Sequence, residues 1–383
     1  MLPLSYAVRN LFRSKARLLQ TIGGSALVVL LVMAAVAIND GMKRVLSASG
    51  SPNNVILVGA GSEESIQRSE DADRAGGIAE AAVPGIAEAL GVRAVSSEIH
   101  YMSYLDLGDG ERRQAVFRGV TPQALHVHPE VRLVAGSFPT AGQLMAGRLA
   151  WRKLGLAESD LMPGRQVVLD GQPMTISGTF AAPGTVLESE LWATLGDLRV
   201  LAKRETISCV VLRLDDPADF AEADLFAKQR LDLELSALRE SDYYARLSSF
   251  FKPLRVMTWI TAGLIAAGAV FGGINTLYAA FASRVREMAT LQAIGFGRGA
   301  LLASLVQEST LACLGGTLLA SIAALLLLDG RTVPFSIGAF TLEIGPGVAL
   351  TGILTGLFLG LLGALPPAIR CLKPALPVAL RSS

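Results

Sequence analysis

Residues 18–39 read LLQTIGGSALVVLLVMAAVAIN and contain no charged side chain. A helix needs about 20 residues to cross the roughly 30 Å hydrocarbon core of a membrane, so this run is long enough for one span. Three more charge-free runs follow at residues 256–283, 309–328 and 344–369. The pattern predicts an α-helical membrane protein with four transmembrane helices.

The charged residues lie mainly between the first and the second run. Only 17% of the 383 residues are charged, against about 25% in ordinary soluble domains. Residues 40–255 nevertheless hold 23 basic and 29 acidic side chains. We therefore expect an extracytoplasmic domain inserted between helices 1 and 2. Its net negative charge disfavours binding to nucleic acid, because it would repel phosphates.

Basic residues mark one side of the predicted membrane. They are Arg9, Arg13, Lys15 and Arg17 before the first run, Arg284, Arg286 and Arg298 between the second and third, and Arg370, Lys373 and Arg381 after the fourth. The positive-inside rule makes these segments and both termini cytoplasmic. A cleaved signal peptide is the alternative for the first run, since Ala35-Val36-Ala37 resembles a cleavage site. Its apolar core is longer than the usual length of about 7–15 residues, which favours a span.

The region 40–255 has the pattern of a mixed α/β domain. Strands are predicted at residues 54–58 and 207–214, and turn residues predict hairpins that join 99–107 to 114–120 and 166–169 to 174–180. Helical patterns occupy residues 77–81, 85–89, 143–154, 195–203, 218–229 and 235–251. We expect the last helix to continue into the second span and to transmit displacement.

No catalytic motif is found in the chain. It lacks a phosphate-binding loop, a His-Glu-x-x-His motif, a nucleophile elbow and a Cys-x-x-Cys pair. We expect a non-enzymatic protein that holds no cofactor or metal itself. The three cysteines, Cys209, Cys313 and Cys371, fall in three different predicted segments, so no disulfide within the chain is expected.

Two polar features allow more than one interpretation. His126 and His128 could ligate a metal from one face of a strand, but two ligands do not make a structural zinc site, so a surface loop is favoured. Glu308 could belong to a proton or ion relay. The next 20 residues supply a full span without it, which favours a position at the cytoplasmic interface.

Small residues recur at helical spacing in two of the runs. Gly352, Gly356 and Gly360 repeat every four residues in the fourth run, and Gly268 and Gly272 do so once in the second. This spacing lets the backbones of two membrane helices approach closely. We expect helix packing at both sites, although neither pattern says which helix is the partner.

Two cytoplasmic segments carry a family resemblance. Before the first span, Arg9, Arg13 and Arg17 form a stripe on a predicted amphipathic helix at the membrane surface. The order Ala7-x-Arg9-Asn10-Leu11-x-Arg13-Ser14 resembles the start of MacB/FtsX-type ABC transporter permeases. The second segment, Arg284-x-Arg286-Glu287-x-Ala289-x-Leu291-x-Ala293-Ile294-Gly295, followed by Arg298 and Gln307-Glu308-Ser309, is similar to that family's signature.

The external region resembles the MacB periplasmic domain. Gly91-Val92, Phe117-x-Gly119-Val120-Thr121-Pro122 and Met145-Ala-Gly147-x-Leu149 occur in the expected order. The predicted organisation is a cytoplasmic amphipathic helix at 1–17, helix 1 at 18–39, a periplasmic domain with a helical stalk at 40–255, helix 2 at 256–283, a coupling segment at 284–308, helix 3 at 309–328, an external loop at 329–343, helix 4 at 344–369 and a tail at 370–383.

The resemblance implies a permease subunit in a bacterial inner membrane. It implies a homodimer that recruits a separate ABC ATPase, which binds ATP and Mg, together with membrane lipid and a possible periplasmic adaptor. ATPase coupling would fall on Arg284, Arg286, Glu287, Leu291, Ile294, Gly295 and Arg298. Efflux is the favoured role. The alternatives are a mechanotransmitter that controls a periplasmic hydrolase, a lipoprotein-extracting subunit, and a membrane-anchored sensor without an ATPase.

Overall fold

The computed structural model describes residues 4–108 and 110–373, and the chain divides into two compact units. The helical unit consists of Met1–Asp40, Pro253–Arg331 and Leu342–Ser383, and the sheet unit of Gly41–Lys252 and Thr332–Thr341. Three parts of the predictions lie outside the described residues: the first three residues of the surface helix, Asp109 in the first hairpin turn, and Arg381 in the tail.

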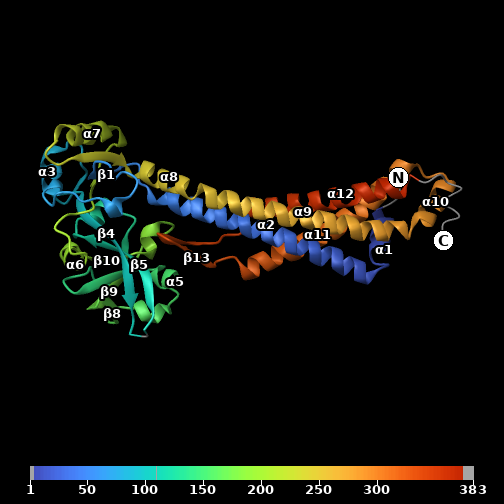
Figure 1. The fold of residues 1–383 in the computed structure, drawn as a ribbon, viewed down its shortest axis with the longest axis horizontal. Helices are drawn as coiled ribbons and strands as arrows, with labels where there is room; N and C mark the ends of the chain where they lie inside the picture. The colour runs from blue at the N-terminus through green and yellow to red at the C-terminus, as the bar shows by residue number, and fades with distance from the viewer. Residues whose placement is uncertain (1–3, 109, 374–383) are drawn as a thin grey trace. The chain divides into compact units, whose positions relative to one another are not determined.

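The helical unit contains the long helices seen in Figure 1. Its elements are α1 (Leu4–Leu11), α2 (Lys15–Ser49), α9 (Lys252–Ala282), α10 (Val285–Ala293), α11 (Arg298–Leu327) and α12 (Pro346–Cys371). Among the described residues, α2, α9, α11 and α12 are long and apolar enough to cross a membrane. Each of these four helices coincides with one of the four charge-free runs, to within two residues where a helix stops short of its run. Both α2 and α11 extend well beyond them, because a helix can continue through polar flanking sequence.

The predicted surface helix is shorter than expected. Helix α1 ends at Leu11, Arg13 lies in the following turn, and Arg17 already belongs to α2. The three arginines therefore do not share one helix, and the predicted continuous stripe is wrong. Ser14, directly before α2, accepts a backbone hydrogen bond from Leu18 at 3.0 Å. Serine is favoured at the start of helices, which explains why a new helix begins there.

The glycine stripe of the fourth run packs inside the unit. A Cβ atom added at Gly360 would lie 2.7 Å from the Cα of Thr310 on α11, and one at Gly352 would lie 2.8 Å from the Met33 sulfur on α2. Gly268 and Gly272 on α9 have no such neighbour within 4 Å. The α12 glycines thus let α12 approach α11 and α2, whereas the two α9 glycines make no comparable close approach among the described residues.

The sheet unit is built on a ten-stranded sheet with the order β12-β1-β11-β4-β5-β10-β7-β9-β6, in which β8 pairs with β4 and β9. Its strands are β1 (Asn54–Gly59), β4 (Val95–Asp106), β5 (Arg112–Val120), β6 (Arg132–Gly136), β7 (Gln143–Gly147), β8 (Gln166–Leu169), β9 (Gln172–Ala181), β10 (Leu191–Thr194), β11 (Cys209–Arg213) and β12 (Leu235–Arg239). A separate ribbon pairs β2 (Glu88–Ala89) with β3 (Val92–Arg93).

Helices and helical turns lie on this sheet, as Figure 1 shows for α3, α6 and α7. The helices are α3 (Ala75–Ala82), α4 (Ala124–Val127), α5 (Ala150–Leu154), α6 (Leu195–Leu201), α7 (Phe220–Gln229) and α8 (Glu240–Phe250). The 3-10 turns are η1 (Ile66–Arg68), η2 (Glu158–Leu161), η3 (Val186–Ser189) and η4 (Pro217–Asp219). The main apolar core includes Leu57, Phe117 and Leu191, which are almost fully buried.

Strand β4 connects the two halves of the sheet. Its first residues pair with β11, and from Ile99 onward it pairs with β5 in the predicted hairpin. The second hairpin, β8 with β9, is also confirmed, with Asp170 and Gly171 at positive φ as a tight two-residue turn requires. The strands predicted near residues 54–58 and 207–214 are present as β1 and β11.

Two helical predictions are wrong in part and a third is wrong throughout. Residues 143–147 form the buried strand β7 between β9 and β10, and 235–239 form β12 beside β1. The second of the two short pieces, 85–89, contains strand β2 instead of a helix. Short buried apolar runs look alike in helices and strands, so only pairing partners far along the chain decide between them. The expected continuous stalk is also interrupted, because α8 ends at Phe250 and α9 begins at Lys252.

The predicted external loop 329–343 contains a β-hairpin that belongs to the sheet unit. Strands β13 (Thr332–Phe335) and β14 (Gly338–Thr341) pair with each other. The Arg152 guanidinium donates a hydrogen bond to the Thr332 hydroxyl at 2.8 Å, and the Phe335 and Phe251 rings meet edge to face at 5.7 Å. The buried Phe340 ring lies against Gly41, where an added Cβ would come within 2.5 Å.

Candidate functional site

The segment between α9 and α11 forms the short helix α10, which has an inner and an outer face. Met288 and Ala289 are buried, and Leu291 packs against the same apolar cluster, which includes Phe281 and Leu305. The opposite face carries Arg286, Thr290, Ala293 and Ile294, all of them exposed and spaced along one side of the helix. Ile294 is 70% exposed.

A buried ion pair fixes the start of α10 to α11. The Arg284 guanidinium donates to both carboxylate oxygens of Glu308, at 2.9 and 3.2 Å, and both side chains are only 8% exposed. The Asn10 amide of α1 donates to the same carboxylate at 3.2 Å. Burial opposes the charge on Arg284, but Glu308 outweighs burial and raises the pKa of Arg284. One carboxylate therefore holds α1, α10 and α11 together.

A second ion pair extends this network toward the surface. The Arg13 guanidinium lies 2.6 Å from a carboxylate oxygen of Glu287, and Arg284 lies 3.4 Å from the other oxygen. We call Asn10, Arg13, Arg284, Glu287 and Glu308 the junction network. At its outer end the network is exposed: the Arg13 side chain is 69% exposed and the Glu287 side chain 38%. The network ties α10 rigidly to two other helices.

The structure divides the predicted coupling residues into two groups. Arg284 and Glu287 belong to the junction network and Leu291 faces inward, whereas Arg286, Ile294, Gly295 and Arg298 are exposed. Arg9 is exposed on α1. A role of these residues in ATPase coupling stays a prediction.

The sequence did not predict the contacts that Glu308 and Asn10 make. Glu308 is buried inside the unit and bonded to Arg284, and its position at the cytoplasmic interface stays a prediction. A carboxylate inside such an apolar stretch needs a cationic partner, and this rule could have pointed to one of the nearby arginines. Asn10 gave no signal of its own in the sequence.

The sheet unit contains a second buried group of charged side chains. Arg118 on β5 makes a two-pronged ion pair with Glu190 at 2.7 and 2.9 Å and contacts Glu98 on β4 at 2.5 Å. The other oxygen of Glu98 lies 3.1 Å from the His128 ring. Nearby, the Glu240 carboxylate at the start of α8 accepts hydrogen bonds from Asn54 at 2.9 Å and from the Ser51 amide at 3.0 Å.

These contacts shift the pKa values of the buried groups. Burial opposes ionisation of Glu98, yet Arg118 holds its pKa well below the usual range. Burial likewise opposes the charge on His128, but Glu98 raises its pKa to about 10. The pKa of Glu240 is raised by burial, and burial together with Arg118 lowers the pKa of His100. At neutral pH the group therefore contains matched charges on Arg118, His128, Glu98 and Glu190.

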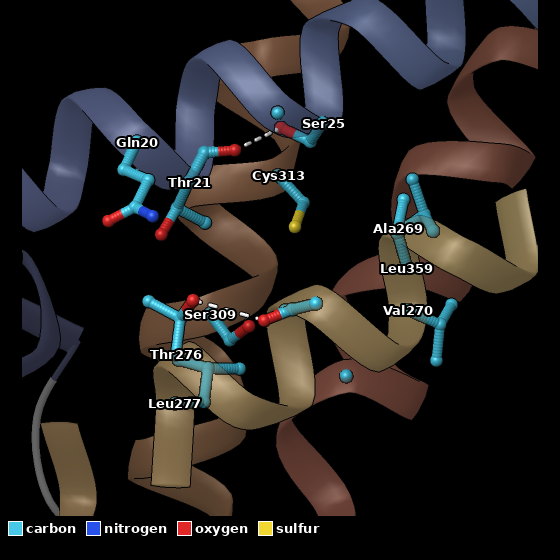
Figure 2. Close-up of a pocket in the computed structure, with 14 residues that line it drawn as sticks. Gln20, Thr21, Ser25, Ala269, Val270, Thr276, Leu277, Ser309, Cys313 and Leu359 are labelled. Atoms are coloured by element: carbon cyan, nitrogen blue, oxygen red, sulfur yellow. Dashed lines mark hydrogen bonds between the residues drawn. The ribbon is translucent and has the colours of Figure 1, made fainter. Parts of the chain in front are cut away.

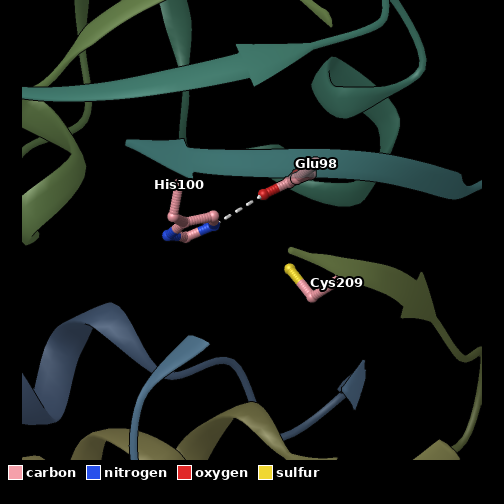
Figure 3. Close-up of side chains that lie close together, drawn as sticks. All are labelled: Glu98, His100 and Cys209. Atoms are coloured by element: carbon pink, nitrogen blue, oxygen red, sulfur yellow. Dashed lines mark hydrogen bonds and ion pairs between the residues drawn. The ribbon is translucent and has the colours of Figure 1, made fainter. Parts of the chain in front are cut away.

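Glu98, His100 and Cys209 lie close together in the same region (Figure 3), with potential ligand atoms within 4.8 Å of one another. This trio does not fit a metal ion. Both oxygens of Glu98 are already bonded to the positive groups of Arg118 and His128, and the Arg118 guanidinium lies 3.0 Å from the His100 ring nitrogen. A cation here would be repelled by two positive charges.

One prediction about the external region is corrected by these contacts. His128 is fully buried at the end of α4, so the expected surface loop is wrong for this residue. Cys209 is also fully buried, and burial raises the pKa of its thiol. It therefore cannot report which side of the membrane it faces, because a thiol reagent reacts with an accessible thiolate.

Two protein-family models match the chain. The model of the MacB-like periplasmic core domain matches residues 18–224, and that of the FtsX-like permease C-terminal region matches residues 259–376. No curated protein matches the chain.

Among solved structures, the chain is similar to the periplasmic region of MacB from Actinobacillus actinomycetemcomitans. The identity is 12%, 52% of this chain and 94% of that chain are covered, and the TM-score is 0.39. It is also similar to the extracellular domain of the noncanonic ABC-type transporter YknZ from Gram-positive bacteria, with 14% identity, 49% and 100% coverage and a TM-score of 0.37.

The two family models match consecutive parts of the chain, and their order agrees with that of the apolar helices and the inserted sheet unit. The first includes α2 and most of the sheet unit, and the second includes α10, α11 and α12. The chain belongs to the MacB/FtsX-type permeases of ABC transporters.

Proposed function

We propose that this permease couples ATP hydrolysis by a partner ABC ATPase to movement of its periplasmic domain, in efflux. In this proposal α2, α9, α11 and α12 span the bacterial inner membrane. Both termini and α10 face the cytoplasm, the sheet unit faces the periplasm, and two copies form a homodimer. ATP and Mg bind the partner ATPase, and a periplasmic adaptor completes the pathway.

The observation that carries the proposal is the two-faced helix α10. Its outer face presents Arg286 and Ile294 to a partner, while its inner face and the junction network hold it against α1 and α11. Force applied by an ATPase to α10 would therefore displace α11 directly. Because α10 also follows α9 in the chain with only a short connection, two apolar helices would move together.

The test is recovery of the ATPase with the tagged permease from its host. The variant Arg286→Glu with Ile294→Asp reverses one exposed charge and introduces another into the proposed interface, where an unpaired buried charge costs several kcal/mol. We expect at least a tenfold loss of bound ATPase, since about 1.4 kcal/mol corresponds to a factor of ten. Both positions are exposed, so the permease itself should fold and insert normally.

Leu231→Asp is the matched control, because Leu231 is 80% exposed and lies in the sheet unit. This change also places a carboxylate at an exposed apolar position, and it should leave ATPase recovery unchanged. Stoichiometric ATPase on the doubly substituted permease would contradict the assignment of α10. The exposed Arg9 on α1 would then be the better candidate for the contact.

A mechanotransmitter is the second candidate, and the β13–β14 hairpin favours it. Because the hairpin belongs to the sheet unit, the chain passes from one unit to the other four times, after Asp40, Lys252, Arg331 and Thr341. Each of these crossings lies in the chain within or close to a different one of the four apolar helices. Each of these helices is thus connected covalently to the sheet unit, so that its movement reaches that unit through the chain. Purification with bound subunits separates the candidates: an adaptor supports efflux, whereas a periplasmic hydrolase or lipoproteins support mechanotransmission.

A further inference from the structure

The helical unit contains a partly open cavity of about 350 Å³ between α2, α9, α11 and α12. Figure 2 shows its walls, which are formed by Gln20, Thr21 and Ser25 on one side and by Ala269, Val270 and Thr276 on another. None of the side chains that line it carries a formal charge. The volume is within the range of about 300–1,000 Å³ that small-molecule sites occupy.

The polar side chains gather at one end of the cavity. Helices α2 and α11 run away from the α10 side, whereas α9 and α12 run toward it. The early residues Gln20, Thr21 and Ser309 therefore lie at the same end as Thr276, as Figure 2 shows. Ala269, Val270 and Leu359 line the other end. We call the end of the cavity toward α10 its polar pole and the opposite end its apolar pole.

The hydroxyl groups of this cavity leave hydrogen-bond acceptors for a ligand. The Thr276 hydroxyl donates to the carbonyl of Gly272 at 3.0 Å, and the Ser25 hydroxyl donates to the carbonyl of Thr21 at 2.8 Å. A hydroxyl that has used its hydrogen still accepts through its lone pairs. The chemistry of the polar pole therefore matches a head group that donates hydrogen bonds.

A small cavity of about 20 Å³ continues from the polar pole. It shares Thr21, Leu277 and Ser309 with the large cavity and reaches Glu308. The Glu308 carboxylate is already bonded to Arg284 and Asn10, so it adds no uncompensated charge. A charged head group would lose its hydration here without an ionic partner, which is costly. An uncharged head group meets no such penalty.

We propose that this cavity binds a single-chain amphiphile with an uncharged, hydroxyl-bearing head group, of the monoacylglycerol class. The head group lies at the polar pole near Thr21, Thr276 and Ser309, and the apolar chain lies along Ala269, Val270 and Leu359. The site lies on the α10 side of the four apolar helices, next to the junction network. Its occupancy is independent of the ATPase contact proposed for the outer face of α10.

The test measures equilibrium binding of monooleoylglycerol and of oleate to the full-length protein in detergent, by native mass spectrometry. Gly24→Leu and Gly273→Leu fill the cavity from opposite walls. Gly23→Leu and Gly263→Leu are matched controls on the same two helices, outside the lining. All four glycines have no heavy atom within 4 Å of an added Cβ, so all four variants should fold.

We expect the two cavity variants to bind monooleoylglycerol at least tenfold more weakly than the unchanged protein. The two control variants should bind it with an affinity within twofold of that of the unchanged protein. Oleate, which carries the same chain with a charged head, should bind at least tenfold more weakly than monooleoylglycerol. Equal binding of the two probes, no binding of monooleoylglycerol, or equal loss in the cavity and control variants would each overturn the proposal. So would dissociation of a dimer by the cavity variants with amphiphile binding unchanged, since a second copy would then cover this cavity.

A second measurement on the unchanged protein does not depend on any variant. A monoacylglycerol with a photoreactive group in its chain should label peptides that contain residues 269–277 or 20–25. Labelling confined to other parts of the protein would overturn the proposal even if a cavity variant failed to fold.

Discussion

Glu308 shows how one carboxylate can organise a helical unit. It accepts hydrogen bonds from Arg284 at 2.9 Å and from Asn10 at 3.2 Å, although these residues are 24 and 298 positions away in the chain. Removing one partner of a buried ion pair typically costs about 3–5 kcal/mol, because the other charge stays buried and unpaired. The position of α10 therefore depends on residues that do not lie on it.

At the residue scale, His128 makes the stability of the sheet unit depend on pH. Contact with Glu98 raises its pKa in the folded protein to about 10, from an ordinary value of 6.5. A histidine whose pKa is raised by folding stabilises the protein fully below about pH 6.5, and this contribution is lost as the pH rises through about 10. Glu98, whose pKa is lowered, stays ionised throughout that range.

We predict that His128→Gln removes this dependence. The variant should be less stable than the unchanged protein at pH 6.5, by about 3–5 kcal/mol as for a broken buried pair, and the difference should shrink toward pH 10. Fluorescence of Trp192, whose ring centroid lies 6.2 Å from that of His128, reports unfolding when Trp151 and Trp259 are replaced by Phe. An equal change of stability with pH in both proteins would contradict the raised pKa.

At the element scale, the glycines of α12 and α9 differ in what surrounds them. Gly360 faces the backbone of α11, whereas Gly268 faces open space within the chain. We predict that Gly360→Leu lowers the thermal unfolding midpoint of the detergent-solubilised protein, since overpacking costs about 1–3 kcal/mol or more. Gly268→Leu, the control for the same substitution in an apolar helix, should leave the midpoint nearly unchanged. Equal midpoints for the two variants would show that α12 does not approach α11 as described.

The sequence predicts elements well where local chemistry decides them. The β8–β9 hairpin follows from Asp170-Gly171, and the four long helices follow from charge-free length. It fails where distant partners decide. Residues 143–147 become a strand because β9 and β10 flank them. At the end of this strand, Gly147 lets the turn η3 approach closely, since an added Cβ would strike the Glu188 carbonyl group.

The candidate site, too, could be predicted only in part from the sequence. The motif from Arg284 to Gly295 identified α10, but only the structure separates the inward Leu291 from the outward Ile294. The buried group around Arg118 was not predicted, because Glu98, Arg118, His128 and Glu190 are scattered along the chain and each alone looks like a surface residue. Pairing of β4 with β5 brings the first two together.

At the scale of the whole molecule, the proposed topology can be tested with new cysteines, because Cys209 is buried. Ser159 in the sheet unit and Ala293 on α10 are both exposed. In cells whose outer membrane has been permeabilised, we predict that a membrane-impermeant maleimide labels Ser159→Cys but labels Ala293→Cys only after lysis. The reverse pattern would place α10 outside and contradict the proposed coupling to an ATPase.

The β13–β14 hairpin has a consequence for anyone who excises the soluble part of such permeases. A fragment made of residues 41–252 alone would lack Phe335 and Phe340, and would expose the surfaces around Gly41 and Phe251 that they cover. Newly exposed apolar surface of this kind promotes aggregation. A fragment that appends residues 332–341 through a flexible linker would restore the missing ribbon, and it is the one we expect to remain monodisperse at concentrations needed for crystallisation.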